Sequence, residues 1–398
     1  MKVHDVIIIG GGPAGLFCAA NINDKDVLIL EKNEKVAKKL LVSGGGKCNF
    51  TNINPVNELI SHYGDKKNFV KKTLYNYSNE DLLKEVDFEY IITDEGKVFP
   101  KTMNSRTVLN WILKKIKDKG KIEVKRNLKV INIERREDKF YIKTNKGTFL
   151  SKILVISTGG KSYPALGTTG DGFNFAKRFG HNIITPKPAL TPIIIKDYLF
   201  SDLSGSSMEI MLKINKKLFK GTLLFTHKGF SGPVILNSSR YLKNGKKIKI
   251  SFVDFKNEDL FRIDFLNVLD NNKNKSLYDI LRQKYNLTKR FVAIMFKTLK
   301  FDKSKKCNSI NKNERNKIIN YLYNHEFFIE KLGGFDVAMV TAGGVDTKEI
   351  NSKTMESKLI RNLYFIGEVL DVDGDSGGYN IQWALSSAKS AADNINIF

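Results

Sequence analysis

The sequence predicts a discontinuous α/β fold, in which the two ends of the chain build one Rossmann-like domain around a central insertion. An apolar run at residues 6–9 leads into Gly10-x-Gly12-x-x-Gly15 and a helical pattern. Residues 363–385 again read as a strand, a glycine-rich loop and a helix. The middle of the chain instead shows short alternating runs, followed by apolar residues at helical spacing.

The first glycine motif is the fingerprint of a dinucleotide site. Gly10 allows the tight turn, Gly12 lets the backbone approach a pyrophosphate, and Gly15 lets the helix pack on the strand. A second strand at residues 27–30 ends at Glu31, about 20 residues after the first glycine, where a carboxylate can bind ribose hydroxyls. We therefore predict a bound dinucleotide whose phosphates lie at the helix N-terminus.

The C-terminal segment favours FAD over NAD. Its strand at residues 363–366 stops at Gly367-Glu368, and a loop with three further glycines leads into a helical pattern over residues 381–392. FAD must be held along its whole length, and a helix N-terminus beside the flavin pyrimidine stabilises the anionic N1–C2=O of reduced flavin. The alternative is a glycine-rich turn that only closes the sheet.

Residues 38–52 (KKLLVSGGGKCNFTN) are a third landmark. Three glycines after Ser43 let the backbone wrap closely around a ligand, because glycine tolerates conformations that other residues avoid. Cys48, Asn49 and Thr51 supply polar groups at the same place. We expect this segment to line the cofactor.

Three further segments carry a resemblance to a known family, namely residues 159–172 (GGKSYPALGTTGDG), 223–233 (LLFTHKGFSGP) and 340–345 (VTAGGV). Together with the segments above, they make the chain resemble the BaiN/RdsA family of HI0933-like flavoproteins over essentially its full length. The resemblance implies an FAD-bound two-dinucleotide-type fold with an inserted β-barrel and helical subdomain. It also implies a reductase of activated C=C bonds, since the family includes 23S ribosomal RNA dihydrouridine synthases and bile-acid ene-reductases. Lys47 replaces the usual arginine, which loses planar bidentate pairing at that position.

We expect residues 1–185 and 335–398 to form the FAD-binding domain, residues 186–256 a β-barrel-like domain, and residues 257–334 a helical subdomain. The expected cofactor-binding residues lie in the strand ends and glycine-rich loops of the two outer segments. They are Gly10, Gly12, Pro13, Ala14, Gly15, Glu31, Lys32, Lys39, Ser43, Gly44, Gly45, Gly46, Lys47, Cys48, Asn49, Thr51, Val130, Thr158, Gly159, Gly160, Gly367, Glu368, Gly378, Asn380 and Ile381.

The positive charge is concentrated in the insertion. The chain has a net charge of +24, and residues 186–331 hold 29 Lys and Arg against 13 Asp and Glu, a balance of +16. A lysine-rich composition imposed by an AT-rich genome is one explanation, but it would raise the charge everywhere. A polyanion partner is the other explanation, because clustered cations displace condensed counterions from nucleic acid.

These observations favour an FAD-dependent reductase that converts uridine to dihydrouridine in 23S ribosomal RNA. Hydride from flavin N5 would go to uracil C6, and a general acid would protonate C5. Cys48 and His227 are the candidate acids, although Cys48 could be a small buried residue and His227 an ordinary surface residue. Because the chain has a single GxGxxG motif, we expect NAD(P)H to dock only transiently as the reductant.

Other functions stay open. One is a small-molecule ene-reductase or amine oxidase of the same family. Another is an FAD-binding RNA chaperone or ribosome-assembly factor in which the flavin is structural.

Composition limits the remaining possibilities. The chain is 41% hydrophobic and 27% charged, which is typical of a soluble globular protein, and no apolar run reaches the roughly 20 residues of a membrane helix. The first strand begins almost at residue 1, so we expect a cytoplasmic protein without a signal peptide. Three distant cysteines and five scattered histidines favour neither a disulfide framework nor a metal site. The oligomeric state is not predicted.

Overall fold

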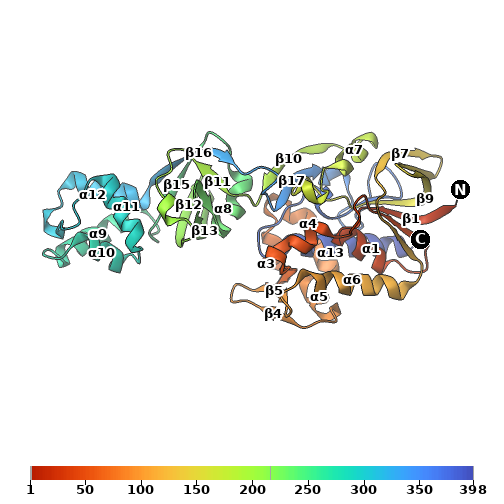
Figure 1. Ribbon diagram of the computed structural model, residues 1–398, viewed down its shortest axis with the longest axis horizontal. Coiled ribbons are helices and arrows are strands. Elements are labelled where there is room, and N and C mark those ends of the chain that lie inside the picture. Colours follow the sequence, from red (N-terminus) through yellow and green to blue (C-terminus); the bar gives the residue numbers. More distant parts are fainter. Residues whose placement is uncertain (1, 216, 398) are drawn as a thin grey trace. The chain divides into compact units, whose positions relative to one another are not determined.

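The computed structural model describes residues 2–215 and 217–397. They divide into two compact units, which are Met1–Ala189 with Phe335–Phe398, and Leu190–Gly334 (Figure 1). The first unit is therefore discontinuous, and the second unit is inserted into its sequence.

The first unit is built on a mixed sheet in the order β6-β2-β1-β9-β8-β7, with β18 pairing the C-terminal part of β9. Its parallel strands are β1 (Val3–Ile9), β2 (Val27–Leu30), β6 (Ile122–Lys125), β9 (Gly147–Ile156) and β18 (Leu363–Phe365). Its antiparallel strands are β7 (Val130–Arg136) and β8 (Lys139–Thr144). Since β1 and β18 both pair with β9, the two ends of the chain meet in one sheet.

Helices cover this sheet. The helix α1 (Pro13–Asn21) packs against α13 (Tyr379–Asn396) and α6 (Ser105–Lys119), and the rings of Phe17 and Trp111 lie 5.6 Å apart between α1 and α6. The shorter helices of this unit are α2 (Lys38–Val42), α3 (Val56–Ser61), α4 (Lys67–Asn76), α5 (Asn79–Glu85) and α7 (Asp171–Arg178). The first and last helices thus share one core.

Two small sheets complete the first unit. One has the order β3-β5-β4, formed by β3 (Thr51–Asn52), β5 (Lys97–Pro100) and β4 (Tyr90–Ile92). In the other, β10 (Ile183–Ala189) pairs antiparallel with β17 (Val340–Val345), so the strands before and after the inserted unit lie side by side.

The second unit combines a closed barrel with helices around one apolar core. The barrel order is β11 (Ile193–Ile195), β14 (Gly229–Ser231), β13 (Lys217–Phe225), β12 (Ser207–Ile214), β15 (Lys247–Ser251) and β16 (His325–Leu332). Its helices are α8 (Pro233–Ser238), α9 (Glu258–Asn271), α10 (Leu277–Lys284), α11 (Lys289–Leu299) and α12 (Lys312–Tyr323). Fully buried Phe200 lies among rings from both parts.

One expectation needs correction. Residues 257–334 were expected to form a helical subdomain, but β16 (His325–Leu332) within this range is a barrel strand that pairs with β11 and β15. The physical reason is its period of two, since Phe327 and Ile329 point into the core while their neighbours are exposed. The chain therefore leaves the barrel after β15, forms the helices, and returns to close the barrel.

Candidate functional site

The glycine turn between β1 and α1 forms a cradle. A Cβ on Gly10 would lie 2.6 Å from the Ser157 carbonyl oxygen, and a Cβ on Gly15 would lie 2.1 Å from the Gly10 oxygen. Both positions therefore need glycine for packing. A Cβ on Gly12 would meet no described atom within 4 Å, so the backbone faces open space there. Because Pro13 starts the helix and no described side chain caps it, the amides of its first turn are available to an anion.

Glu31 stands at the end of β2 beside this turn. Its side chain is buried, and its Oε2 accepts a 2.7 Å hydrogen bond from the Gly11 amide. Its Oε1 accepts bonds from the Asn33 amide at 2.7 Å and from Asn33 Nδ2 at 2.8 Å. The carboxylate is thereby fixed next to the glycine turn, where a ribose would follow a pyrophosphate.

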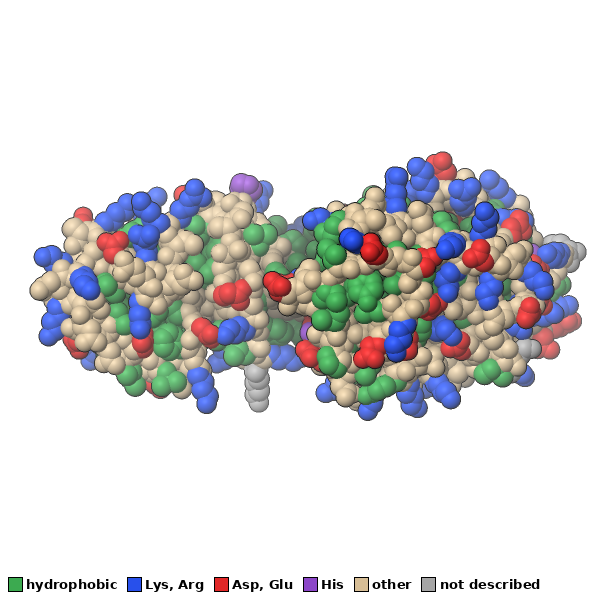
Figure 2. All heavy atoms as spheres, turned by 90° about the horizontal axis from the view of Figure 1, so that it is seen from below, with side chains coloured by type: hydrophobic (Ala, Val, Ile, Leu, Met, Phe, Trp, Pro, Cys, Tyr) green, Lys and Arg blue, Asp and Glu red, His purple; other side chains and the backbone are tan. Residues whose placement is uncertain are grey.

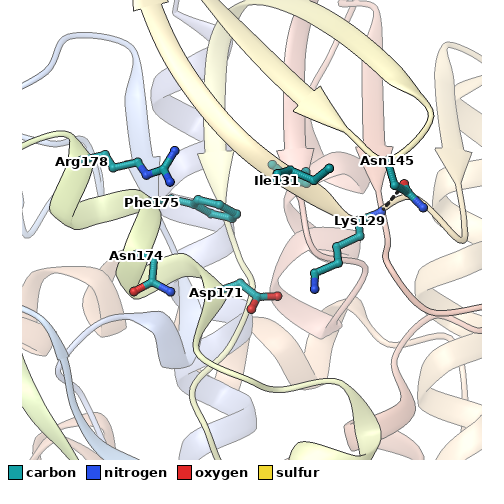
Figure 3. A pocket seen from close by; sticks show the side chains of 8 residues that line it. Lys129, Ile131, Asn145, Asp171, Asn174, Phe175 and Arg178 are labelled. Atoms are coloured by element: carbon teal, nitrogen blue, oxygen red, sulfur yellow. Dashed lines mark hydrogen bonds between the residues drawn. The ribbon is translucent and has the colours of Figure 1, made fainter.

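A pocket of about 370 Å³ lies between the start of β7 and α7. It is lined by Lys129, Val130, Ile131, Asn145, Asp171, Asn174, Phe175 and Arg178 (Figure 3). Asp171 also forms a 2.6 Å ion pair with Lys32, which follows Glu31 in the sequence. The expected residue Val130 therefore lines this pocket, and the expected residue Lys32 is linked to it through Asp171.

The turn after α2 is a second open stretch of backbone. Gly44, Gly45 and Gly46 have φ angles of +55°, +66° and +84°, in the left-handed region that favours glycine. A Cβ on Gly45 would meet no described atom within 4 Å, and a Cβ on Gly46 would meet only the Leu41 oxygen at 3.9 Å. Ser43 begins this turn and the Lys47 side chain is exposed after it. The turn therefore presents backbone, rather than side chains, to a ligand.

Asn49 and Thr51 support the turn from within the protein. Asn49 Nδ2 donates hydrogen bonds to the carbonyl oxygens of Thr51 and Val98 at 2.9 and 3.0 Å. Thr51 Oγ1 donates a 2.6 Å bond to Gln382 Oε1 on α13. Asn49 thus fixes this segment to β5, and Thr51 joins it to the last helix.

The loop before α13 is held in place by several contacts. His62 Nδ1 lies 3.0 Å from Asp375 Oδ2, and the His62 ring stacks on Tyr379 with centroids 4.1 Å apart. Lys66 forms an ion pair with Asp371, whose side chain is almost fully buried. Asn380 Nδ2 donates to the Gly374 oxygen at 2.9 Å, and its Oδ1 accepts from the Gly374 amide at 2.8 Å.

The start of α13 itself remains open. Gly378 is its N-cap residue with a φ of +96°, and a Cβ there would lie 2.3 Å from the Thr51 oxygen. Among the residues that the structure describes, no side chain caps this helix. The first amides of α13, which include those of Asn380 and half-buried Ile381, can therefore bind an acceptor oxygen.

Lys39 and Glu368 belong to one partly buried polar network. Their side chains form a 2.5 Å ion pair, and Glu368 Oε1 accepts bonds from Ser162 Oγ at 3.0 Å and from the Thr341 amide at 2.9 Å. A Cβ on Gly160 would lie 2.3 Å from Thr341 Oγ1, so glycine is required at that position. The network joins α2, the loop after β9, β17 and the segment after β18.

Comparisons with known proteins identify the family of the chain. A family model described as the HI0933-like protein Rossmann domain matches residues 4–394. The chain belongs to this family. It is 34% identical over 403 residues to a protein of Haemophilus influenzae named ribosomal RNA dihydrouridine synthase, with 98% of each chain covered. An Escherichia coli protein of the same name is 33% identical, with 99% of this chain and 98% of the relative covered.

More distant relatives share the fold. A 3-dehydro-bile acid delta(4,6)-reductase of Clostridium scindens is 26% identical over 96% of this chain and 97% of its own length. A solved 3-ketosteroid delta1-dehydrogenase of Sterolibacterium denitrificans superposes with a TM-score of 0.51, 12% identity and full coverage of both chains. A flavocytochrome c3 fumarate reductase superposes with a TM-score of 0.51 and 16% identity, covering 100% of this chain and 78% of its own.

The chain is accordingly an FAD-dependent oxidoreductase of the HI0933-like family, and its expected α/β class and inserted barrel are confirmed. The geometry of the first unit fits FAD. Besides the open backbone at Gly12, it contains Thr158 Oγ1, which is buried without a hydrogen-bond partner among the described residues. Gly159, with a φ of +72°, follows Thr158 directly. Gly367 packs on α1, since a Cβ there would lie 3.0 Å from the Ala14 Cβ.

The two candidate acids lie in different units. The Cys48 side chain is fully buried, and this burial raises the pKa of its thiol to about 12, although a hydrogen bond from Ser43 lowers it in part. Cys48 therefore stays a neutral thiol at physiological pH. His227 is exposed in the turn between β13 and β14 of the second unit.

Sequence reasoning missed several polar residues of the site. His62 and Lys66 follow α3 and hold the loop before α13, while Ser162 and Thr341 complete the network around Glu368. They carry no motif of their own and meet their partners only through the fold. Within the described ranges, no helix is long and apolar enough to cross a membrane, and no cluster of three or more His, Cys, Asp or Glu could hold a metal.

Proposed function

We propose that the protein reduces uridine to dihydrouridine in 23S ribosomal RNA. The observation that carries the proposal is the similarity of 34% and 33%, over nearly the full length of both chains, to two proteins named ribosomal RNA dihydrouridine synthase. The balance of +16 over residues 186–331 supports an RNA partner bound by the insertion. Such a substrate places the reaction in the cytoplasm.

The residues of the first unit would hold FAD along its length. The amides at the start of α1, next to Gly12, would bind the pyrophosphate, and Glu31 would bind the adjacent ribose. The open backbone at Gly44 to Gly46 and the first amides of α13 would surround the isoalloxazine. The amides of α13 would stabilise negative charge on the reduced ring.

FAD, reduced by NAD(P)H, would supply a hydride to C6 of the uracil ring. The chain must then provide a proton for C5 and keep the base oriented. Cys48 is protonated and can donate, but its side chain is fully buried and its raised pKa makes it a weak acid. The exposed imidazole of His227 is the other candidate donor. A Cys48→Ala variant that keeps its flavin and full turnover would remove Cys48 from the mechanism, and a His227→Gln variant tests the other candidate in the same way.

A second candidate is the reduction of a small-molecule enone. It is favoured by the relative of 26% identity over 96% of this chain that is named a 3-dehydro-bile acid delta(4,6)-reductase. The two candidates share the hydride chemistry and differ in substrate. A hydrophobic small molecule, however, gives no reason for the excess of cations in the insertion.

Mass-spectrometric mapping of dihydrouridine in 23S ribosomal RNA tests the proposal in cells. The strains compared lack the gene, or carry a plasmid copy of the wild type or of a Gly15→Val variant. We expect a uridine that is 2 Da heavier to disappear with the gene and to return only with the wild-type copy, because Val at position 15 clashes with the Gly10 oxygen. An unchanged pattern in every strain would favour the small-molecule reductase.

A further inference from the structure

The helical part of the second unit carries a dense positive charge. Residues 289–306, which form α11 and the turn after it, contain seven Lys or Arg and one Asp, a balance of +6. This segment of 18 residues thus holds a quarter of the net charge of +24 of the 398-residue chain. Figure 2 shows Lys and Arg side chains spread over this unit, on the left, where they outnumber the acidic side chains.

The cations of α11 gather on one side of the helix. On a helical wheel, the exposed side chains of Lys289, Arg290 and Lys297 fall within an arc of about 100°. Exposed Lys300 is the C-cap residue that follows the helix directly. The opposite side packs into the core of the unit through Phe291 and Met295, which are fully buried. The basic face consists of these four residues together with exposed Lys303 and Lys306 from the following turn.

Tyr278 shows that the turn and the helix start lie together. Its hydroxyl donates a 2.8 Å hydrogen bond to the carbonyl oxygen of Lys289. Its ring centroid lies 6.0 Å from the Nζ of Lys303. The two lysines are 14 positions apart in sequence and still meet around one aromatic side chain, so the basic face is continuous across α11 and the turn.

The charge of the basic face is not neutralised within the chain. Over residues 2–215 and 217–397, no ion pair involves any of its six residues. The carboxylate of nearby Asp302 accepts hydrogen bonds from the backbone and side chain of Ser304. The barrel differs, because Lys247 and Lys249 both contact Glu326 there.

Two cations of the basic face lie where they destabilise α11. Lys289 and Arg290 occupy the first turn of α11, where the macrodipole favours anions, and that turn contains no acidic residue. The first turns of α9, α10 and α12 all contain acidic residues. Fold stability therefore does not account for Lys289 and Arg290, whereas a bound phosphate would be attracted by both cations and by the helix end.

We propose, building on the proposed function, that the basic face binds the phosphate backbone of the RNA substrate. Its cations are exposed, unpaired and continuous, which is the arrangement that releases condensed counterions from RNA. Such contacts carry no sequence information, so the face would supply affinity and leave the choice of uridine to other parts of the protein.

The test measures binding of the full-length, FAD-loaded protein to 23S ribosomal RNA transcribed in vitro, across a series of salt concentrations. The variant carries Lys289→Gln, Arg290→Gln, Lys297→Gln and Lys300→Gln. We expect binding at least about tenfold weaker, and a slope of log affinity against log salt that is smaller by about 3, because four phosphate contacts are lost.

The matched control removes the same charge from the barrel of the same unit through Lys220→Gln, Lys243→Gln, Lys246→Gln and Lys247→Gln. We expect its affinity to stay within about threefold of the wild type, because distant charges are screened at moderate salt. FAD content and melting temperature confirm that both variants are folded.

The outcomes separate this inference from the proposed function. Equal losses in the two variants would mean that only overall charge matters, and the basic face would be rejected. Unchanged binding by the α11 variant would reject it as well, while the proposed function would stand if the wild type still forms dihydrouridine in cells. A wild type that neither binds this RNA nor forms dihydrouridine would overturn both.

Discussion

The glycines of the first turn have different physical roles. Gly10 and Gly15 are required by packing, because a Cβ at either position would lie closer than 3 Å to backbone oxygen. Gly12 is different, since its Cβ would meet no described atom within 4 Å. The fold therefore does not fill the space in front of Gly12, where the proposed pyrophosphate site lies.

We predict that Gly12→Ala separates cofactor binding from stability. The new methyl group would occupy the space of the pyrophosphate, so FAD affinity should fall at least about tenfold, or about 1.4 kcal/mol. The melting temperature of the FAD-free protein should not change. Titration with FAD measures the affinity, and thermal unfolding measures the melting temperature. Gly334→Ala is the control, because its Cβ is also unobstructed by described atoms. Unchanged FAD affinity in Gly12→Ala would exclude this role.

The cysteines should be unreactive in the folded protein. Cys18, Cys48 and Cys307 are all buried, and burial raises the pKa of each thiol. Since the thiolate is the nucleophile, a disulfide reagent near pH 8 should react with none of them until denaturant is added, and then with three. Rapid labelling of Cys48 in the native protein would show that this thiol is accessible. That result would support Cys48 as the general acid that protonates C5.

At the scale of elements, the loop before α13 depends on the segment after α3. His62 contacts Asp375, and Lys66 pairs with Asp371, so two neighbouring contacts fix the loop that leads to the helix N-terminus. Neither contact could be predicted from sequence, because more than 300 residues separate the partners and no spacing rule connects them. The glycines of the same loop were predictable, since their conformational freedom is a local property.

Lys66→Met tests the importance of this loop. The substitution leaves the Asp371 carboxylate, whose side chain is 9% exposed, without the ammonium group that now contacts it. We expect a loss of about 1–3 kcal/mol in the free energy of unfolding, together with weaker FAD binding. Lys101→Met is the matched control, because its pair with Glu89 is exposed and should contribute at most about 0.5 kcal/mol. Similar effects of both substitutions would refute the role assigned to Lys66.

The barrel strand β16 contains a titratable group in an aromatic environment. His325 packs against Phe327 with ring centroids 4.4 Å apart, and burial lowers the pKa of its imidazole to about 4. The neutral ring is thus favoured in the folded state. Its contribution to stability is complete above the unfolded pKa of about 6.5 and is lost as the pH falls towards 4.

We therefore predict that the second unit loses up to about 3 kcal/mol of stability between pH 6.5 and pH 4 through His325. Thermal unfolding at several pH values measures this loss. A His325→Phe variant, which keeps a ring but cannot be protonated, should show a smaller decrease over the same range. An identical decrease in the variant would assign the pH dependence to other groups.

At the scale of the whole molecule, the pairing of the two chain ends was predictable. Both ends show an apolar strand followed by a glycine turn and a helix, and these local signals are strong. The return of the chain to the barrel at β16 was not predicted, because Phe327 and Ile329 form too short an alternating run to be recognised next to helical segments. The hydrogen-bond network around Glu368 could not be predicted from the sequence either, because it joins four separate segments of the chain.

The charge distribution is the other property of the whole molecule. The balance of +16 over residues 186–331 was visible in the sequence, but its distribution over paired and unpaired lysines required the structure. The FAD-binding elements belong to the discontinuous first unit, and the basic face belongs to the inserted second unit. Under the proposed function, the first unit would thus bind the cofactor and the second unit would supply RNA affinity.

A single-turnover experiment tests the central claim most directly. The FAD of the purified protein is reduced without oxygen and then mixed with 23S ribosomal RNA from cells that lack the gene. We predict that the absorbance of oxidised flavin returns and that one dihydrouridine forms for each flavin reoxidised. Flavin that stays reduced with this RNA, but is reoxidised by a steroid-like enone, would contradict the account and identify a small-molecule reductase.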